Sequence, residues 1–172
     1  SVLGAKALYT GLITDSGRFR YDGVTSKTFD LASKLFQYKF DVNDIYNNIY
    51  IEDINVVRLR SKLSLIFEIS KGGVAYLKNT QEDIKKYNTD IFTISRGMVN
   101  VMSGIRGIDI WVNFTEDVDG KILTEIRSSK YNINPVAVKY GGGGHKQASG
   151  TTLNSFDECD LLIEDLEKVL EK

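Results

Sequence analysis

The stretch IDIWVNFTEDVDGKILTEIRSS, residues 108–129, decides the fold because it contains two strand patterns joined by a turn. Apolar and polar residues alternate along its first half, as expected for a strand with one buried face. Asp119-Gly120 is a turn signal, and the alternation resumes on the return strand. We therefore predict an antiparallel pair, whose shared face is formed by Ile108, Ile110, Val112 and Phe114 on the first strand and by Ile122, Thr124 and Ile126 on the second.

A second strand pair is predicted upstream. Residues 63–70 and 74–80 are strand-like runs separated by Lys71-Gly72-Gly73, a combination typical of a hairpin. Thr80 follows with Asp83 three residues later, which is the spacing of a capping box and predicts the start of a helix. Strands and helices therefore alternate irregularly in this part of the chain.

Two further helices are predicted around the central strand pair. One covers residues 94–104, and the other closes the chain over residues 155–172. Ser155 is the expected cap of the closing helix, and Glu158 would complete its capping box. This helix has an apolar stripe that predicts burial on one side, formed by Phe156, Cys159, Ile163, Leu166 and Leu170.

The segment before these strands is predicted to be helical. Its first helix begins near Ala5 and ends at the turn Asp15-Ser16-Gly17. Later helical patterns cover residues 25–38, a segment capped by Asp41, and residues 56–63. A boundary is therefore expected within residues 52–62. The predicted fold class is α+β: a helical linker followed by a small mixed β-sheet domain flanked by helices.

The composition limits the classes of function. The net charge of −1 does not suit a surface that grips long nucleic acid, although a short anion in a local pocket remains compatible with it. The single cysteine, Cys159, excludes an intramolecular disulfide and fits a reducing cytoplasm. No apolar run approaches the roughly 18 residues of a membrane helix, so no membrane partner is expected. The chain begins inside a helical pattern without an initiator methionine, which suggests a fragment.

Four consecutive glycines, Gly141–Gly144, precede the only histidine of the chain, His145, and Lys146. Glycine costs more backbone entropy to order than any other residue, so the run needs a reason. A flexible linker would mix in serine, a Walker loop would place Ser or Thr after Lys146, and a simple turn would need fewer glycines. We therefore predict a loop that binds an anion, formed between the apolar segment 136–138 and a helical turn starting near His145.

Three other positions are weaker candidates by themselves. Asp15 ends a helix and offers the carboxylate oxygens that Mg²⁺ or Mn²⁺ prefers, but an aspartate at such a place is commonly a turn residue. Arg18 could form a fork on a phosphate or be a surface charge. Arg127 could contact a phosphate or the face of a nucleobase, or could simply lie at an exposed strand end. Ser128 and Ser129 add hydroxyls directly after Arg127, at the predicted end of a strand.

These motifs together resemble those of a known family. GGGGHKQASG, residues 141–150, is similar to the signature of the DHH-associated C-terminal domain of DHH-superfamily phosphoesterases. LYTGLITDSGRFRY, residues 8–21, resembles the last metal-binding motif of their catalytic domain. The order of the motifs resembles the branch that degrades short oligoribonucleotides and 3′-phosphoadenosine 5′-phosphate (pAp). The resemblance implies a remnant of the catalytic domain at 1–22, a helical linker at 23–62 and the substrate-binding domain at 63–172.

The resemblance also implies roles for particular residues. Asp15 matches a ligand of a dinuclear Mn²⁺ (or Mg²⁺) centre. Gly142–Gly144 and His145 would hold the substrate phosphate, while Arg127 and Ser128 would hold the terminal nucleotide. Arg18 and Lys146 are additional candidates on chemical grounds.

The Asp-His-His motif that names the superfamily is absent from the 172 residues. We therefore expect a piece of a cytoplasmic enzyme that binds short RNA or pAp, lacks its N-terminal catalytic domain and is inactive alone. A homodimer is a further candidate assembly. Alternative functions are a non-catalytic nucleotide- or RNA-binding module and a cyclic-dinucleotide phosphodiesterase of the same superfamily.

Overall fold

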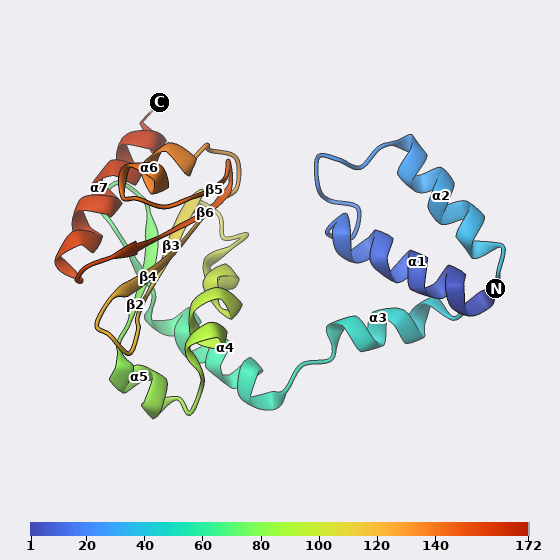
Figure 1. Cartoon of the computed structure of the whole chain (residues 1–172), viewed down its shortest axis with the longest axis horizontal. Coiled ribbons are helices and arrows are strands. Elements are labelled where there is room, and N and C mark those ends of the chain that lie inside the picture. The colour runs from blue at the N-terminus through green and yellow to red at the C-terminus, as the bar shows by residue number, and fades with distance from the viewer. Residues whose placement is uncertain (172) are drawn as a thin grey trace. The chain divides into compact units, whose positions relative to one another are not determined.

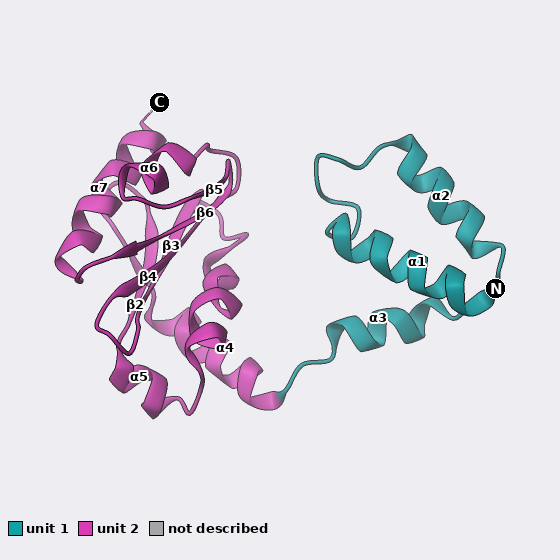
Figure 2. Ribbon diagram, in the orientation of Figure 1, with its two compact units in different colours: residues 1–53 teal, residues 54–172 magenta. Residues whose placement is uncertain are grey.

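The computed structural model describes residues 1–171. The chain forms two compact units, residues 1–53 and residues 54–172 (Figures 1 and 2). Among the described residues, no helix has the length and apolar character needed to cross a bilayer.

The first unit contains three helices around a small core. Helix α1 spans Val2–Asp15, α2 spans Ser26–Phe36 and α3 spans Val42–Tyr50. As predicted, Asp41 caps α3, with its carboxylate accepting hydrogen bonds from the backbone N–H groups of Asn43 and Asp44. The core side chains are Ala5, Tyr9, Ile13, Ala32, Phe40 and Ile45.

The second unit is built on a six-stranded sheet with the order β1-β2-β3-β4-β6-β5. Strands β2 and β3 are parallel, and every other neighbouring pair is antiparallel. The sheet is therefore mixed, and the predicted α+β class is confirmed. The strands are β1 (Glu68–Ile69), β2 (Ala75–Asn79), β3 (Ile110–Glu116), β4 (Ile122–Ser128), β5 (Gly143–His145) and β6 (Ala148–Leu153).

Helical segments cover the two faces of this sheet (Figure 1). The core on one face includes residues of α6 (Asn134–Lys139) and α7 (Asp157–Leu170). The core on the other includes residues of α4 (Ile54–Ile66), the π-helix η1 (Thr93–Gly97) and the 3₁₀-helix η2 (Val99–Met102). A short helix, α5 (Gln81–Lys86), begins with the predicted Thr80–Asp83 capping box.

The central strand pair is confirmed, with one difference. β3 and β4 are antiparallel, and Gly120 adopts a φ of 76° at the turn between them. However, β3 is buried on both faces from Ile110 to Thr115. Ile110, Val112 and Phe114 face α6 and α7, whereas Ile108 precedes the strand and packs in the other core beside Trp111. The sequence pattern could not show this, because Asn113 and Thr115 are polar residues that the structure nevertheless buries.

Three local predictions were wrong. Residues 63–70 were predicted as a strand, but α4 continues to Ile66 and leaves only the two residues of β1. The predicted helix at 94–104 is instead a π-helix followed by a 3₁₀-helix. Ser155 does not cap α7, because Phe156 stands at the cap position and no side chain among the described residues caps the helix. The Glu158 carboxylate instead accepts hydrogen bonds from the backbone nitrogen of Asn154 at 2.8 Å and from its side-chain nitrogen at 3.0 Å.

Candidate functional site

The glycine run connects the end of α6 to the edge strand β5. Gly141 and Gly142 follow α6, and Gly143 begins β5, which pairs with β6 through a tight turn at Lys146 and Gln147. A strand that begins within the glycine run and ends at His145 therefore stands where we predicted a helical turn. The carboxyl end of a helix carries partial negative charge, so no helix dipole at this loop favours an anion. Any anion here must be bound by side chains and by exposed backbone N–H groups.

Three of the four glycines have a structural reason to be glycine. Gly141 has a φ of 79°, in a region that other residues rarely adopt. A Cβ on Gly142 would lie 2.1 Å from the Gly150 carbonyl oxygen, because the backbone passes directly against β6. Gly144 combines a φ of 134° with a Cβ position 2.6 Å from the Ala148 oxygen. Only Gly143 has open space around its Cβ position, so it alone is free of these structural constraints.

Short polar side chains that sequence reasoning missed hold this hairpin against α6. The Asn134 amide donates to the Gly144 oxygen at 3.0 Å and to the Ser149 hydroxyl at 3.3 Å. Ser149 in turn donates to the His145 oxygen at 2.8 Å, and Thr151 donates to the Tyr140 oxygen at 2.6 Å. Ser149 and Thr151 are buried at alternate positions of β6. Polar residues at the inward positions of a strand were the available signal for these anchors.

Asp165 anchors the helix that leads into the glycines. It accepts hydrogen bonds from Tyr140 at 2.8 Å, from Lys168 at 3.0 Å and from Lys139. Burial alone would raise the pKa of this carboxyl, but these three donors hold its pKa at about 2. The Asp165 carboxylate therefore fixes the end of α6, from which the glycine run starts, in its charged form.

Replacing Asp165 with asparagine is expected to lower the free energy of unfolding by about 2 kcal/mol at pH 7, since hydrogen bonds to a charged group are lost. The folded pKa lies below the ordinary value of 3.8, so the contribution of Asp165 is complete above that pH and disappears as the pH falls towards 2. Urea unfolding at pH 7 and at pH 2.5 measures this, with exposed Asp119→Asn as the control. An Asp165→Asn deficit that is the same at both pH values would contradict it.

One face of the sheet brings together two of the predicted binding residues. Arg127 on β4 is paired with Ala148 on β6, and Ala148 is paired with His145 on β5. Directly paired residues project to the same face, so Arg127 and His145 lie on one face about 10 Å apart, the width of two strand spacings. His145 and Lys146 are exposed, and among the described residues the imidazole has no hydrogen-bond partner.

Ser128 lies on the opposite face from Arg127. Its hydroxyl donates to the Tyr131 oxygen at 2.5 Å, and the residue is buried at the end of β4. The structure therefore does not bring the two adjacent side chains together on one face, contrary to the expectation from sequence. Successive residues of a strand point to opposite faces, which is the physical reason.

A hollow of about 540 Å³ adjoins the face that carries Arg127. Its floor includes Glu125 and Gly150 of the sheet together with Gly142, and its wall includes Phe92 and the η1 segment. The Glu125 carboxylate receives a hydrogen bond from Arg127 at 2.8 Å and lies 3.7 Å from the Arg96 guanidinium. Two arginines therefore share one carboxylate, which leaves a local excess of positive charge. Arg96 was not predicted, because no sequence motif marks it.

Asp15 and Arg18 lie in the first unit. Asp15 is the exposed last residue of α1. The next turn is strained, because Arg18 and Phe19, which are not glycines, have φ values of 61° and 63°. The Arg18 guanidinium lies 5.1 Å from the centre of the Tyr50 ring, a cation–π contact, and the residue is exposed. Among residues 1–171, no group of three or more His, Cys, Asp or Glu side chains could hold a metal ion, so Asp15 does not form a metal site by itself.

The sequence of this chain is similar to those of known proteins over nearly its whole length. The chain is 36% identical over 163 residues to the bifunctional oligoribonuclease and PAP phosphatase NrnA of Bacillus subtilis, covering 95% of this chain and 51% of that protein. It is 34% identical over 167 residues to a probable NrnA of Streptococcus mutans, covering 96% and 53% respectively. The chain therefore spans about half the length of these curated relatives.

A solved structure and a family model also match this chain. The crystal structure of an exopolyphosphatase-related protein from Bacteroides fragilis superposes with a TM-score of 0.87 at 26% identity, covering 100% of this chain and 53% of the other. The family described as DHHA1 domain matches residues 85–172, which include Arg96, Arg127, the glycine run and His145. That match covers just over half of the sequence, and the chain belongs to the DHHA1 domain family.

Proposed function

We propose that this chain supplies the substrate-binding domain of a cytoplasmic phosphoesterase that hydrolyses short oligoribonucleotides or pAp. The observation that carries the proposal is the arrangement on one sheet face, where the register places Arg127 and His145 and where Arg96 and Glu125 line a hollow. The similarity to NrnA proteins supports the same substrate class. These substrates are short anions, which suits a local basic site on a chain with a net charge of −1.

The chemistry of the side chains fits a phosphate with its sugar. Arg127 already donates from Nη1 to the Ile126 and Ser149 oxygens and from Nη2 to Glu125, so its remaining N–H groups are the ones that can reach phosphate oxygens. His145 offers an unpaired imidazole. The open space at Gly143 lets the backbone approach the ligand. Lys146 at the hairpin turn adds a flexible cation. We assign Ser128 a positioning role, since its hydrogen bond to Tyr131 fixes the chain that leads into α6.

We further propose that Asp15 contributes one ligand to a metal centre completed by residues outside these 172. Hard divalent cations such as Mn²⁺ or Mg²⁺ prefer carboxylate oxygens, and one such cation would activate water and stabilise the charge of the phosphoryl group. The described residues do not provide the other ligands, so catalysis belongs to a protein that supplies them. The turn after Asp15 orients the end of α1, and Arg18, which packs on Tyr50, remains a further candidate for a phosphate contact.

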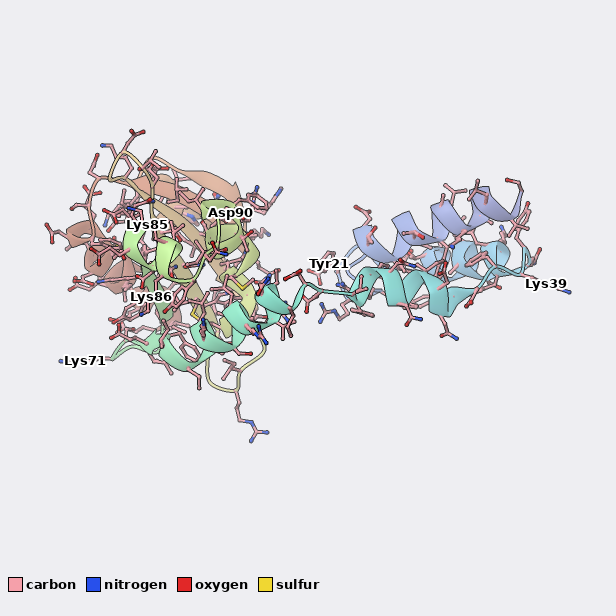
Figure 3. All side chains as sticks on the ribbon, turned by 90° about the horizontal axis from the view of Figure 1, so that it is seen from below. Tyr21, Lys39, Lys71, Lys85, Lys86 and Asp90 are labelled. Atoms are coloured by element: carbon pink, nitrogen blue, oxygen red, sulfur yellow. The ribbon has the colours of Figure 1, made fainter. Side chains whose placement is uncertain are left out.

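Removing Arg127 or His145 is expected to weaken binding of a 5′-phosphorylated diribonucleotide by about 10-fold or more, since each variant loses a hydrogen bond to a charged group. Titration of Arg127→Ala and His145→Ala by calorimetry measures this, and Arg127→Lys should recover part of the loss. Lys71→Ala is the matched control, because Lys71 is an exposed cation at the β1–β2 turn (Figure 3).

Equal affinity of wild type, Arg127→Ala and His145→Ala would refute the assignment of these residues. The same titration separates the alternative functions. Preference for a cyclic over a linear dinucleotide would favour a cyclic-dinucleotide phosphodiesterase. Tighter binding of long RNA than of the dinucleotide would favour an RNA-binding module.

A further inference from the structure

Phe92 is an exposed aromatic residue on the wall of the hollow. The residue is 65% exposed, and it lines the hollow together with Ile91 and Ser95. We propose that the Phe92 ring is a stacking surface for a nucleobase of the bound oligonucleotide, with Arg96 contacting the adjoining phosphate. This proposal rests on the function proposed above and extends it from the phosphate to the base.

Asp90, labelled in Figure 3, constrains the backbone from the N-terminal side of Phe92. The Asp90 carboxylate accepts hydrogen bonds from the Thr93 nitrogen at 2.9 Å and from the Thr93 hydroxyl at 2.6 Å. These hydrogen bonds to Thr93 lower the pKa of Asp90, so the carboxylate stays charged at neutral pH. The backbone on both sides of Phe92 is therefore constrained.

The position is fixed from the C-terminal side by Asn113. This side chain is fully buried in β3, and its amide donates to the carbonyl oxygens of Ile94 and Ser95, at 2.8 Å each. A π-helix widens the turn and often occurs at functional sites. Here the buried amide satisfies two carbonyls of the π-helix and holds η1 against the sheet. The backbone that carries Phe92 therefore does not need to be ordered when a base stacks on the ring, which lowers the entropic cost of binding.

The remaining chemistry of the hollow favours a nucleotide over an apolar partner. Arg96 is 64% exposed and lies one helical turn from Phe92, and a Glu125 oxygen on the floor lies only 3.7 Å from the Arg96 guanidinium. An aromatic ring beside an arginine is the combination that binds successive bases and phosphates of single-stranded nucleic acid. The volume of about 540 Å³ lies within the usual range of small-molecule sites, about 300–1,000 Å³.

Two probes test the proposal: 5′-phosphorylated diadenylate and the same dinucleotide without its bases. Phe92→Ala is expected to weaken binding of diadenylate by about 5- to 150-fold, the range for one base–aromatic stack, and to leave the abasic probe unchanged. Phe92→Leu keeps an apolar side chain without a ring and should show most of the loss. Phe92→Tyr keeps the ring and should bind as wild type does.

The control variant is Leu161→Ala, which removes an exposed apolar side chain from α7, away from the hollow. If Phe92→Ala and Phe92→Leu bind diadenylate as tightly as wild type, stacking is refuted while the proposed function stands. If Phe92→Ala weakens both probes equally, the ring acts on the phosphate site rather than on a base, and the proposal fails. If wild type binds neither probe, the proposed function and this inference fail together.

Discussion

Replacing Gly144 with alanine is expected to lower the free energy of unfolding of the second unit by about 3 kcal/mol. The new Cβ would lie 2.6 Å from the Ala148 oxygen and 2.8 Å from the Ser149 Cα, two backbone atoms of the paired strand. The φ of 134° adds strain for any residue with a side chain. Relief requires β5 to move away from β6, which would break the edge of the sheet.

Gly143→Ala is the matched control, one residue earlier on the same strand. Its added Cβ meets no atom within 4 Å, and its backbone is not in the left-handed region. Its stability should equal that of wild type or exceed it by up to about 1 kcal/mol, since the unfolded chain loses freedom. Urea unfolding followed by circular dichroism measures both variants. Equal losses in the two would show that the glycines are needed for flexibility and not for close packing.

This contrast shows what the glycine run could and could not predict. The four consecutive glycines indicated that the loop has a particular role, and we predicted from them that it binds an anion. The structure attributes three of them to backbone geometry against β6, which depends on a strand pairing that local sequence does not specify. Gly143 and His145 therefore carry the functional argument that was first made from the whole run.

The other predictions from sequence divide in the same way, between features that depend on adjacent residues and features that depend on contacts between distant segments. The turn at Asp119-Gly120, the Asp41 cap and the Thr80 capping box depend on adjacent residues, and all three are confirmed. Arg127 and Ser128 were adjacent candidates as well, but the alternation along β4 separates them. Arg96 and Phe92 reach the hollow only because η1 packs on the sheet. That contact brings together segments that are far apart in the chain, so no short motif could reveal it.

The buried amides of β2 and β3 explain why residues 94–104 do not form an ordinary helix. Asn79 donates to the Asn113 oxygen at 2.6 Å, and the Asn113 nitrogen then donates to the two carbonyls of η1. Both side chains are almost completely buried. A buried polar group without a partner costs about 1–3 kcal/mol, so the carbonyls of η1 and the amide of Asn113 stabilise each other. The helical pattern at 94–104 gave no sign of this partner, which comes from the sheet.

Asn113→Asp should therefore be strongly destabilising, by about 3–5 kcal/mol at pH 7, because it places a carboxylate against the carbonyl oxygens of Ile94 and Ser95. Burial and these oxygens would raise the folded pKa of the introduced carboxyl above its unfolded value of about 3.9. The deficit should therefore be smallest below pH 4, where the neutral acid still donates one of the two hydrogen bonds, and should grow by up to about 1.4 kcal/mol per pH unit above it. Urea unfolding between pH 4 and pH 7 measures this slope. Exposed Asn132→Asp is the control and should show almost no slope, since its side-chain oxygen accepts a hydrogen bond from the Asn134 nitrogen that a carboxylate can equally accept. A loss of unfolding free energy that does not change with pH would mean that Asn113 stabilises η1 through its shape alone. The hydrogen bonds from Asn113 to η1 would then not explain how β3 constrains the backbone at Phe92.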